Sequence, residues 1–226
     1  MTYTGQPFTP DIPGAQVVPA HVTNVIQSRT NVPKVLVIHT PEEPVDDYES
    51  TPSYFATANR SASTHYYQDS DGDLVQCVPE RYGAIANGVK GKPYPVGTDP
   101  AVSLNYQSLS IEVEGYAAGM NRTCPPGSRQ WDALRNWIIS RGLTHRITIA
   151  RSRVIGHYEV ANDRSDPGTI RLDQLVDEAA EYAGRLLAAT EAEQKALRLF
   201  AALEPLLRAR DFVALHRALH YVGVGT

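Results

Sequence analysis

Residues 34–40 are Lys-Val-Leu-Val-Ile-His-Thr, and the fold prediction starts from them. The run is short, apolar and mostly β-branched, and Pro41 stops it, which is typical of a buried strand. Residues 108–114, Ser-Leu-Ser-Ile-Glu-Val-Glu, alternate polar and apolar positions and are followed by Gly115, so they predict a second strand. Residues 153–157, Arg-Val-Ile-Gly-His, predict the end of a third strand. The chain therefore contains several short strands rich in Val and Ile.

Two more strands are predicted at residues 63–68 and 74–78, which are joined around Asp71-Gly72, a dipeptide typical of β-hairpins. Three helices are predicted from proline placement, capping and helical periodicity: residues 51–59, residues 128–141 with Ser128 as the N-cap and Gly142 as the stop, and residues 172–188. Strands that alternate with helices predict an α/β fold with a mixed central β-sheet flanked by helices and a C-terminal helical tail.

Three segments are predicted along the chain. Residues 1–33 carry several prolines, among them Pro10, Pro13, Pro19 and Pro33, and little periodicity, so we expect an extended N-terminal wrap. Residues 34–188 contain the strands and helices of the main domain. Residues 189–226 begin with the capping box Thr190-Glu-Ala-Glu193 and continue with leucines at helical spacing, which predicts a helical tail. At this length the tail is too small for an independent domain.

Composition excludes several classes of function. The 226 residues are 42% hydrophobic and 20% charged, with a net charge of −4, so a packed core is expected and nucleic acid is not an expected partner. No apolar stretch approaches the length of a membrane span, so membrane insertion is not expected. Arginine outnumbers lysine 17 to 4, which suggests a GC-rich genome. No pattern in the sequence predicts an oligomeric state.

Two histidines stand at strand ends, where open α/β sheets gather ligands and catalytic groups. His39 ends the strand of residues 34–40, and His157 follows Val-Ile-Gly at the end of another strand. Asp166 lies in the polar loop that follows. Two imidazoles and one carboxylate form a set that binds zinc and leaves a fourth position for water. The sequence distance between the histidines does not show proximity, so ordinary packed or solvated histidines remain the alternative.

Glu112 and Glu114 lie two positions apart on the strand of residues 108–114, so their side chains are expected on one face. Near a metal-activated water, Glu112 could act as general base in attack on a carbonyl. For Glu114 we favour a salt bridge or a solvent-facing position. A metal-free glycosidase with these two carboxylates as acid and base is the rival interpretation. It leaves the two histidines and Asp166 unexplained.

Four motifs occur together in the order of a known family: Val35-Leu-Val-Ile-His39; Ser63-Thr-His-Tyr66 with Asp71-Gly72 and Val75-Gln-Cys-Val-Pro79; Ser110-Ile-Glu-Val-Glu-Gly115; and Gly156-His157 with Asp166-Pro-Gly168. Over about residues 33–188 the chain resembles the type 2 N-acetylmuramoyl-L-alanine amidases, zinc enzymes related to peptidoglycan recognition proteins. The resemblance implies a mixed sheet with zinc in a groove above it. It also implies hydrolysis of the amide that joins the lactyl group of N-acetylmuramic acid to L-alanine of the peptidoglycan stem peptide.

The resemblance also implies roles for individual residues. His39, His157 and Asp166 match the zinc ligands, and Glu112 matches the catalytic glutamate. Arg164 stands where such amidases often carry a lysine that stabilises the tetrahedral intermediate. An arginine there still places a cation against a developing oxyanion.

Other positions match less closely. His65 falls at a commonly occupied histidine, and we expect it to support the site or contact substrate without binding metal. Some relatives have Trp-His-Ala-Gly where this chain has Ile85-Ala-Asn-Gly88, so Ala86 replaces a histidine expected to contact substrate. Asn87 is a candidate for substrate contact or for support of the site.

The expected partner is peptidoglycan, and zinc-dependent amide hydrolysis is the expected activity. Relatives without zinc ligands only bind the polymer; all three ligands and Glu112 are present here, so a binding module is the less favoured alternative. The N-terminus has no basic and apolar signal pattern, so we expect synthesis in the cytoplasm. A phage endolysin that reaches the host wall through holin pores fits this expectation, and a cytoplasmic muropeptide-recycling amidase is the alternative.

Overall fold

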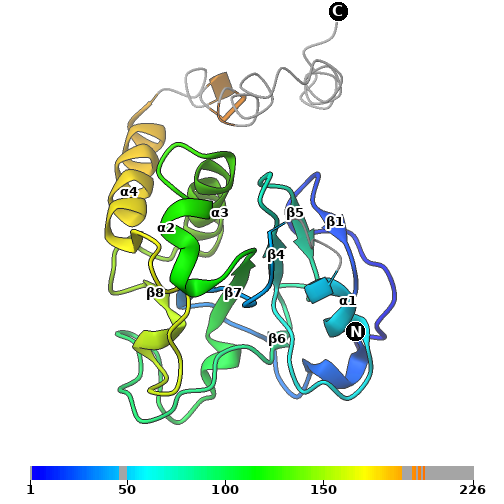
Figure 1. Ribbon diagram of the computed structural model, residues 1–226. Coiled ribbons are helices and arrows are strands. Elements are labelled where there is room, and N and C mark those ends of the chain that lie inside the picture. Colours follow the sequence, from blue (N-terminus) through cyan, green and yellow to red (C-terminus); the bar gives the residue numbers. More distant parts are fainter. Residues whose placement is uncertain (1, 46–49, 190–194, 197, 200, 202–226) are drawn as a thin grey trace, which may run out of the picture.

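The computed structural model describes residues 2–45, 50–189, 195–196, 198–199 and 201 (Figure 1). Most of the predicted tail, residues 189–226, lies outside the described residues. Among the described residues, no helix is both long and apolar enough to cross a membrane.

Six strands form the central sheet between two layers of helix (Figure 1). Their order across the sheet is β1 (Gln16–Val17), β5 (Leu74–Gln76), β4 (Tyr66–Gln68), β7 (Ser108–Val113), β3 (Val35–His39) and β8 (Val154–Gly156). Only β4 and β5 pair in the antiparallel sense; every other neighbouring pair in this sheet is parallel. This confirms the predicted α/β class with a mixed central sheet.

The N-terminal segment takes part in the sheets. Within residues 1–33, for which the sequence predicts only an extended wrap, β1 adds an edge strand beside β5. A 3-10 helix at Val22–Asn24 leads into β2 (Val25–Ile26), which pairs with β6 (Gly83–Ala84) in a separate antiparallel sheet of two strands.

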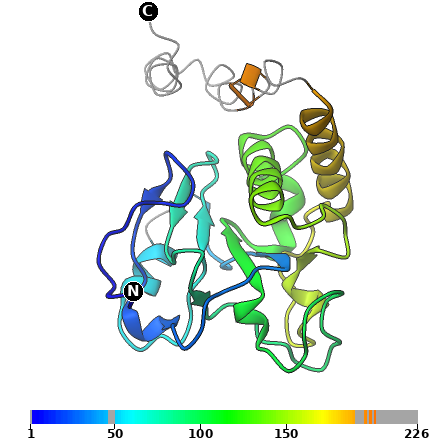
Figure 2. The ribbon, with the colours of Figure 1, turned by 180° about the vertical axis from the view of Figure 1, so that it is seen from behind.

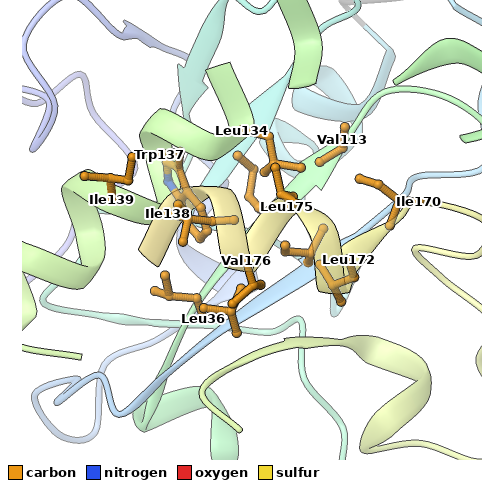
Figure 3. Close-up of a cluster of buried hydrophobic side chains, with 14 of the residues drawn as sticks. Leu36, Val113, Leu134, Trp137, Ile138, Ile139, Ile170, Leu172, Leu175 and Val176 are labelled. Carbon is orange, nitrogen blue, oxygen red and sulfur yellow. The ribbon is translucent and has the colours of Figure 1, made fainter. Parts of the chain in front are cut away.

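The longer helices cover one face of the central sheet, as the two opposite views in Figures 1 and 2 show. The α-helices are α1 (Ser50–Ala56), α2 (Met120–Thr123), α3 (Arg129–His145) and α4 (Leu172–Ala188), with further 3-10 helices at Leu104–Tyr106, Ala117–Gly119 and His157–Glu159. Helices α3 and α4 pack together, and their apolar side chains meet those of the sheet in one buried cluster (Figure 3). Helix α1 lies on the opposite face, where Phe55 packs in a second cluster with Tyr67 and Val75.

Two predicted helix ends are wrong. Helix α3 starts at its predicted cap, where Ser128 accepts from Trp131 N–H at 3.1 Å, but it continues past Gly142 and ends where Arg146 adopts a φ of 56°. Gly142 serves packing instead, since a Cβ there would lie 2.8 Å from Ile149 Cγ1. Helix α1 ends at Ala56, not at residue 59, because the Asn24 side-chain amide donates to the carbonyls of Phe55 and Thr57.

Strand alternation separates the core from the site. On β3 and β7, alternate side chains enter the cluster beneath α3 and α4: Leu36, Ile38, Leu109, Ile111 and Val113. The intervening positions of β7 are Ser108, Ser110 and Glu112, which a strand presents on the opposite face. A row of polar side chains on an inner strand requires partners there. This face holds the groups described in the next section.

A buried ionic cluster joins β4 and the loop after β5 to α3. Glu80 is 6% exposed and accepts from Tyr66 Oη at 2.6 Å, Arg141 Nη1 at 2.7 Å and His145 Nε2 at 2.7 Å. Burial by itself would raise the pKa of Glu80, but the hydrogen bond from His145, the charge of Arg141 and the bond from Tyr66 outweigh it and lower the pKa to about 2. Arg141 is also buried, so each charge depends on the other.

We predict that Glu80→Gln lowers the free energy of unfolding by about 3–5 kcal/mol, because it leaves the buried Arg141 charge uncompensated. The folded pKa lies below the unfolded value, so this stabilisation is present above about pH 4.3 and declines as the pH falls toward about 2. Urea unfolding at several pH values measures both effects. The matched control is Asp71→Asn, which breaks the exposed pair with Arg129 and should cost no more than about 1 kcal/mol. Equal losses in the two variants would contradict the prediction.

Candidate metal centre

The sheet brings His39 and His157 together from distant parts of the chain. Strands β3 and β8 are parallel neighbours with Ile38 opposite Gly156, so the residues that follow, His39 and His157, leave the same edge of the sheet. The two Nδ1 atoms are 3.1 Å apart. The two histidines are therefore close because β3 and β8 are neighbours in the sheet, which their spacing in the sequence does not reveal.

Asp166 completes a triangle of donor atoms. Its Oδ2 lies 3.1 Å from His39 Nδ1 and 3.2 Å from His157 Nδ1, and all three residues are buried. Gly156 permits this placement, because a Cβ there would lie 2.6 Å from Pro167 Cδ. The backbone is also held directly, since Tyr158 N–H donates to the Asp166 carbonyl at 3.0 Å.

The triangle fits a zinc ion. A tetrahedral zinc ion with bonds of about 2.0–2.2 Å separates its ligand atoms by about 3.3–3.5 Å, close to the observed spacing. Burial lowers the pKa of His39, which favours the neutral imidazole that binds metal. Burial would raise the pKa of Asp166, but the neighbouring His157 and His39 rings hold it well below its usual range, so it is a carboxylate.

Asn87 fixes the orientation of the His39 ring. Ser108 Oγ donates to the Leu104 carbonyl at 2.7 Å and so accepts from Asn87 Nδ2, also at 2.7 Å. This leaves Asn87 Oδ1 to accept from His39 Nε2–H at 2.7 Å. The proton on Nε2 directs the Nδ1 lone pair toward His157 and Asp166. Asn87 is 2% exposed, and its contacts here are those of a supporting residue.

Glu112 faces the same triangle from the middle of the sheet. It is the register partner of His39 in the β3–β7 pair, and its side chain lines the cavity that contains the triangle. Its Oε2 is buried and has no hydrogen-bond partner among the described residues. Burial, followed by the charges of Asp166 and Glu43, raises the pKa of Glu112 well above its usual range. A carboxylate with raised proton affinity and a free oxygen is suited to accept a proton in the cavity.

The cavity has a volume of about 600 Å³ and runs from the triangle toward α1. Arg164 lines it as an exposed side chain, and Ala86 and Tyr54 also line it. The structure thus brings His39, His157, Asp166, Glu112 and Arg164 to one cavity. This is the set that the sequence predicts.

His65 does not reach this cavity. It is fully buried, its Nδ1 accepts from Ser110 N–H at 3.1 Å, and its Nε2–H donates to the Tyr82 carbonyl at 3.0 Å. Burial lowers the pKa of His65 to about 4, so the ring is neutral. It supports the sheet beneath the site, and its burial leaves no surface for substrate contact.

For Glu114 the sequence favours a salt bridge or a solvent-facing position, and the solvent-facing position is wrong. Strand β7 ends at Val113, and Glu114 is fully buried, with Oε2 accepting from Ser70 N–H at 2.7 Å. Its side chain does not line the cavity that holds Glu112. The pair of facing carboxylates that a glycosidase would need is therefore not formed by these two residues.

Sequence reasoning missed Ser108 and the acidic pair Glu42-Glu43. Ser108 had a usable signal, because it occupies a polar position of an alternating inner strand. Glu42 lines the cavity, and Glu43 is buried with its Oε1 unpartnered in the described part of the chain. Nothing in the local sequence distinguishes these two from surface glutamates in a loop.

Comparison with known proteins gives a family and a fold. The family model of N-acetylmuramoyl-L-alanine amidases matches residues 29–169, more than half of the chain. No curated protein sequence matches the chain. Three similar solved structures are PlyL (17% identity, TM-score 0.54, covering 73% of this chain and 96% of that one), the catalytic domain of XlyA (16%, 0.51, 74% and 97%) and the amidase LysC from Clostridium intestinale (14%, 0.50, 74% and 97%). At these identities the structures establish the shared fold.

We predict that Asn87→Ala weakens zinc affinity by about 10–100-fold, because the His39 ring loses the acceptor that sets its tautomer and orientation. Competition with a chromophoric chelator measures the dissociation constant. The matched control is Asn136→Ala on α3, far from the cavity, which should leave the affinity unchanged. Wild-type affinity in Asn87→Ala would show that His39 needs no support from this side chain.

Proposed function

The chain belongs to the N-acetylmuramoyl-L-alanine amidase family, and we propose that it is a zinc-dependent enzyme that cleaves the amide between N-acetylmuramic acid and L-alanine in peptidoglycan. The observation that supports this most directly is the triangle of His39, His157 and Asp166, with donor atoms 3.1–3.2 Å apart in a cavity that Glu112 also lines. A zinc ion held there supplies Lewis-acid chemistry, which polarises a carbonyl and acidifies water.

In the proposed reaction, Glu112 moves the proton. Its buried, unpartnered Oε2 accepts a proton from the attacking water, and the raised proton affinity lets Glu112 hold that proton until it passes to the leaving nitrogen of L-alanine. Both steps need the carboxyl group to be within reach of water and substrate, and the cavity provides that access. A raised pKa suits a group that must alternate between base and acid.

Arg164 supplies positive charge at the same cavity. Its exposed guanidinium lines the cavity two residues before Asp166, and we assign it to the oxyanion that develops as the scissile carbonyl is attacked. A purely peptidoglycan-binding role is less favoured, because binding alone gives no reason for Glu112 Oε2 to be buried without a partner among the described residues, beside three metal-ligating groups.

We also propose a biological setting for this activity. The expected role is that of an endolysin, made in the cytoplasm of a phage-infected host and acting on the host cell wall after release through holin pores. The proposed substrate lies outside the cytoplasmic membrane, so an enzyme made in the cytoplasm needs a route of release. The arginine-rich composition supports a phage with a GC-rich host. Induction in a wall-bearing host with and without a co-expressed holin tests this role. Lysis only with the holin is expected, whereas growth without lysis in both cultures would favour a recycling amidase.

Metal removal is the first test of the activity. Purified protein should contain about one zinc per chain and release new L-alanine amino termini from peptidoglycan. Chelation should abolish this release, and added zinc should restore it. New reducing sugar ends without bound metal would instead establish a glycosidase, and binding without cleavage would establish a recognition module.

We predict that Glu112→Gln retains zinc and loses about 10²–10⁴-fold in turnover, because the amide cannot accept the proton from water. His39→Ala should lose both zinc and activity. The matched control is Glu114→Gln, two residues along the chain and outside the cavity, which should keep turnover near the wild-type rate if it folds. Metal content, circular dichroism and amino-terminus release are measured on each variant. Full activity in Glu112→Gln would overturn the assignment of the base.

A further inference from the structure

Glu42 has a backbone conformation that needs an explanation. It lies in the loop after β3, three residues beyond His39, and its φ is 60°. Residues other than glycine adopt this left-handed conformation at a cost, and such residues gather at functional sites, where surrounding contacts maintain them. Glu42 also lines the cavity of the metal centre. The contacts that maintain this conformation are those of the Glu42 carboxylate.

The Glu42 carboxylate reaches across to a second loop. Its Oε1 accepts from Ala117 N–H at 3.1 Å and from Thr40 Oγ1 at 3.2 Å. Ala117 is 4% exposed and begins the 3-10 helix that follows β7, the strand that carries Glu112. The bond thus joins the loop after His39 to the loop after Glu112.

The other side of Ala117 holds a third loop. Its carbonyl accepts from Thr169 N–H at 2.9 Å and from Thr169 Oγ1 at 3.1 Å. Gly168 passes so close that a Cβ would lie 2.1 Å from the Ala117 oxygen, and its φ of 62° also favours glycine. The same turn is closed by Gly168 N–H, which donates to the Ser165 carbonyl at 2.8 Å. This turn contains Asp166.

We propose that Glu42 is a positioning residue for the metal centre. Its carboxylate fixes Ala117, and Ala117 in turn fixes the Gly168–Thr169 segment, so that the turn holds Asp166 Oδ2 at its observed distance from the two histidines. The inference rests on the proposed metal centre and assigns Glu42 no contact with the reacting atoms. The strained φ of Glu42 is the cost of directing its side chain at Ala117.

Three variants separate positioning from general loop stability. Glu42→Gln retains an acceptor oxygen, Glu42→Ala loses the acceptor, and Glu42→Gly loses the acceptor while relieving the backbone strain. The matched control is Glu181→Ala, an exposed glutamate on α4. Zinc dissociation constants are measured by chelator competition, midpoints of urea unfolding report stability, and amide hydrogen exchange of Ala117 and Thr169 is followed in the metal-free protein.

We expect Glu42→Ala and Glu42→Gly to bind zinc about tenfold more weakly and to exchange both amides faster, whereas Glu42→Gln stays within about threefold of the wild type. Glu42→Gly should unfold at a higher urea concentration than Glu42→Ala, because its φ is no longer strained. If Glu42 merely stabilised its loop, zinc affinity would follow stability and recover in Glu42→Gly.

Two outcomes overturn the proposal: wild-type zinc affinity in Glu42→Ala, or restored affinity in Glu42→Gly. Zinc binding is measured without peptidoglycan, so a failure of the proposed amidase activity does not affect this result. If the wild-type chain bound no zinc, the proposed metal centre would fail, and with it the positioning role. Amide protection at Ala117 and Thr169 would then report only whether Glu42 joins the loops.

Discussion

The parallel pairing of β3 with β7 on one side and β8 on the other is the constraint on which the site depends. Parallel strands place their carboxyl ends at one edge, so His39, Glu112 and His157 arrive together although they lie far apart in the chain. Because side chains alternate along each strand, the two faces of the sheet carry different residues. Leu36, Ile38 and the apolar residues of β7 anchor the sheet to α3 and α4, and the alternate positions of β7 carry polar groups on the opposite face.

A buried polar group without a partner is costly, so each unpartnered atom on the inner strand β7 needs a reason. On β7, the Ser108 hydroxyl accepts from Asn87 Nδ2, and the Ser110 hydroxyl accepts from Thr64 Oγ1 and from His65 N–H. Glu112 is the next residue on that face, and its Oε2 has no partner in the described part of the protein. The two serines on this face are hydrogen-bonded, whereas Glu112 Oε2 is not. We infer that Glu112 is there for its chemistry, because a neutral side chain at this position would avoid the cost of burying a carboxylate.

Sequence patterns predicted the α/β class, the strands β3, β4, β5, β7 and β8, and the candidate residues of the metal centre, since each depended on local periodicity or on a motif at a strand end. The short strands β1, β2 and β6 were not predicted. They failed where a distant residue decides the outcome. Helix α1 ends early, where Asn24 donates to the carbonyls of Phe55 and Thr57, and the buried Glu114 carboxylate accepts from the backbone of the hairpin residue Ser70. Asn87 was a candidate without a defined role until the strand order placed it against His39. In each case the missing information is a contact between residues far apart in the chain.

The loops around the site are held by different interactions from those that hold the sheet. The sheet is held by apolar packing and backbone pairing, which are stable against single changes on the surface. The donor atoms instead depend on single hydrogen bonds, from Tyr158 to the Asp166 carbonyl and from His39 to Asn87. A glycine at residue 168 and a strained glutamate at residue 42 let two other loops approach within bonding distance of Ala117. Glu42 thus has an unfavourable backbone conformation that helps to fix the positions of the metal-ligating atoms. The rigid sheet beneath the loops supplies the stability that this strain costs.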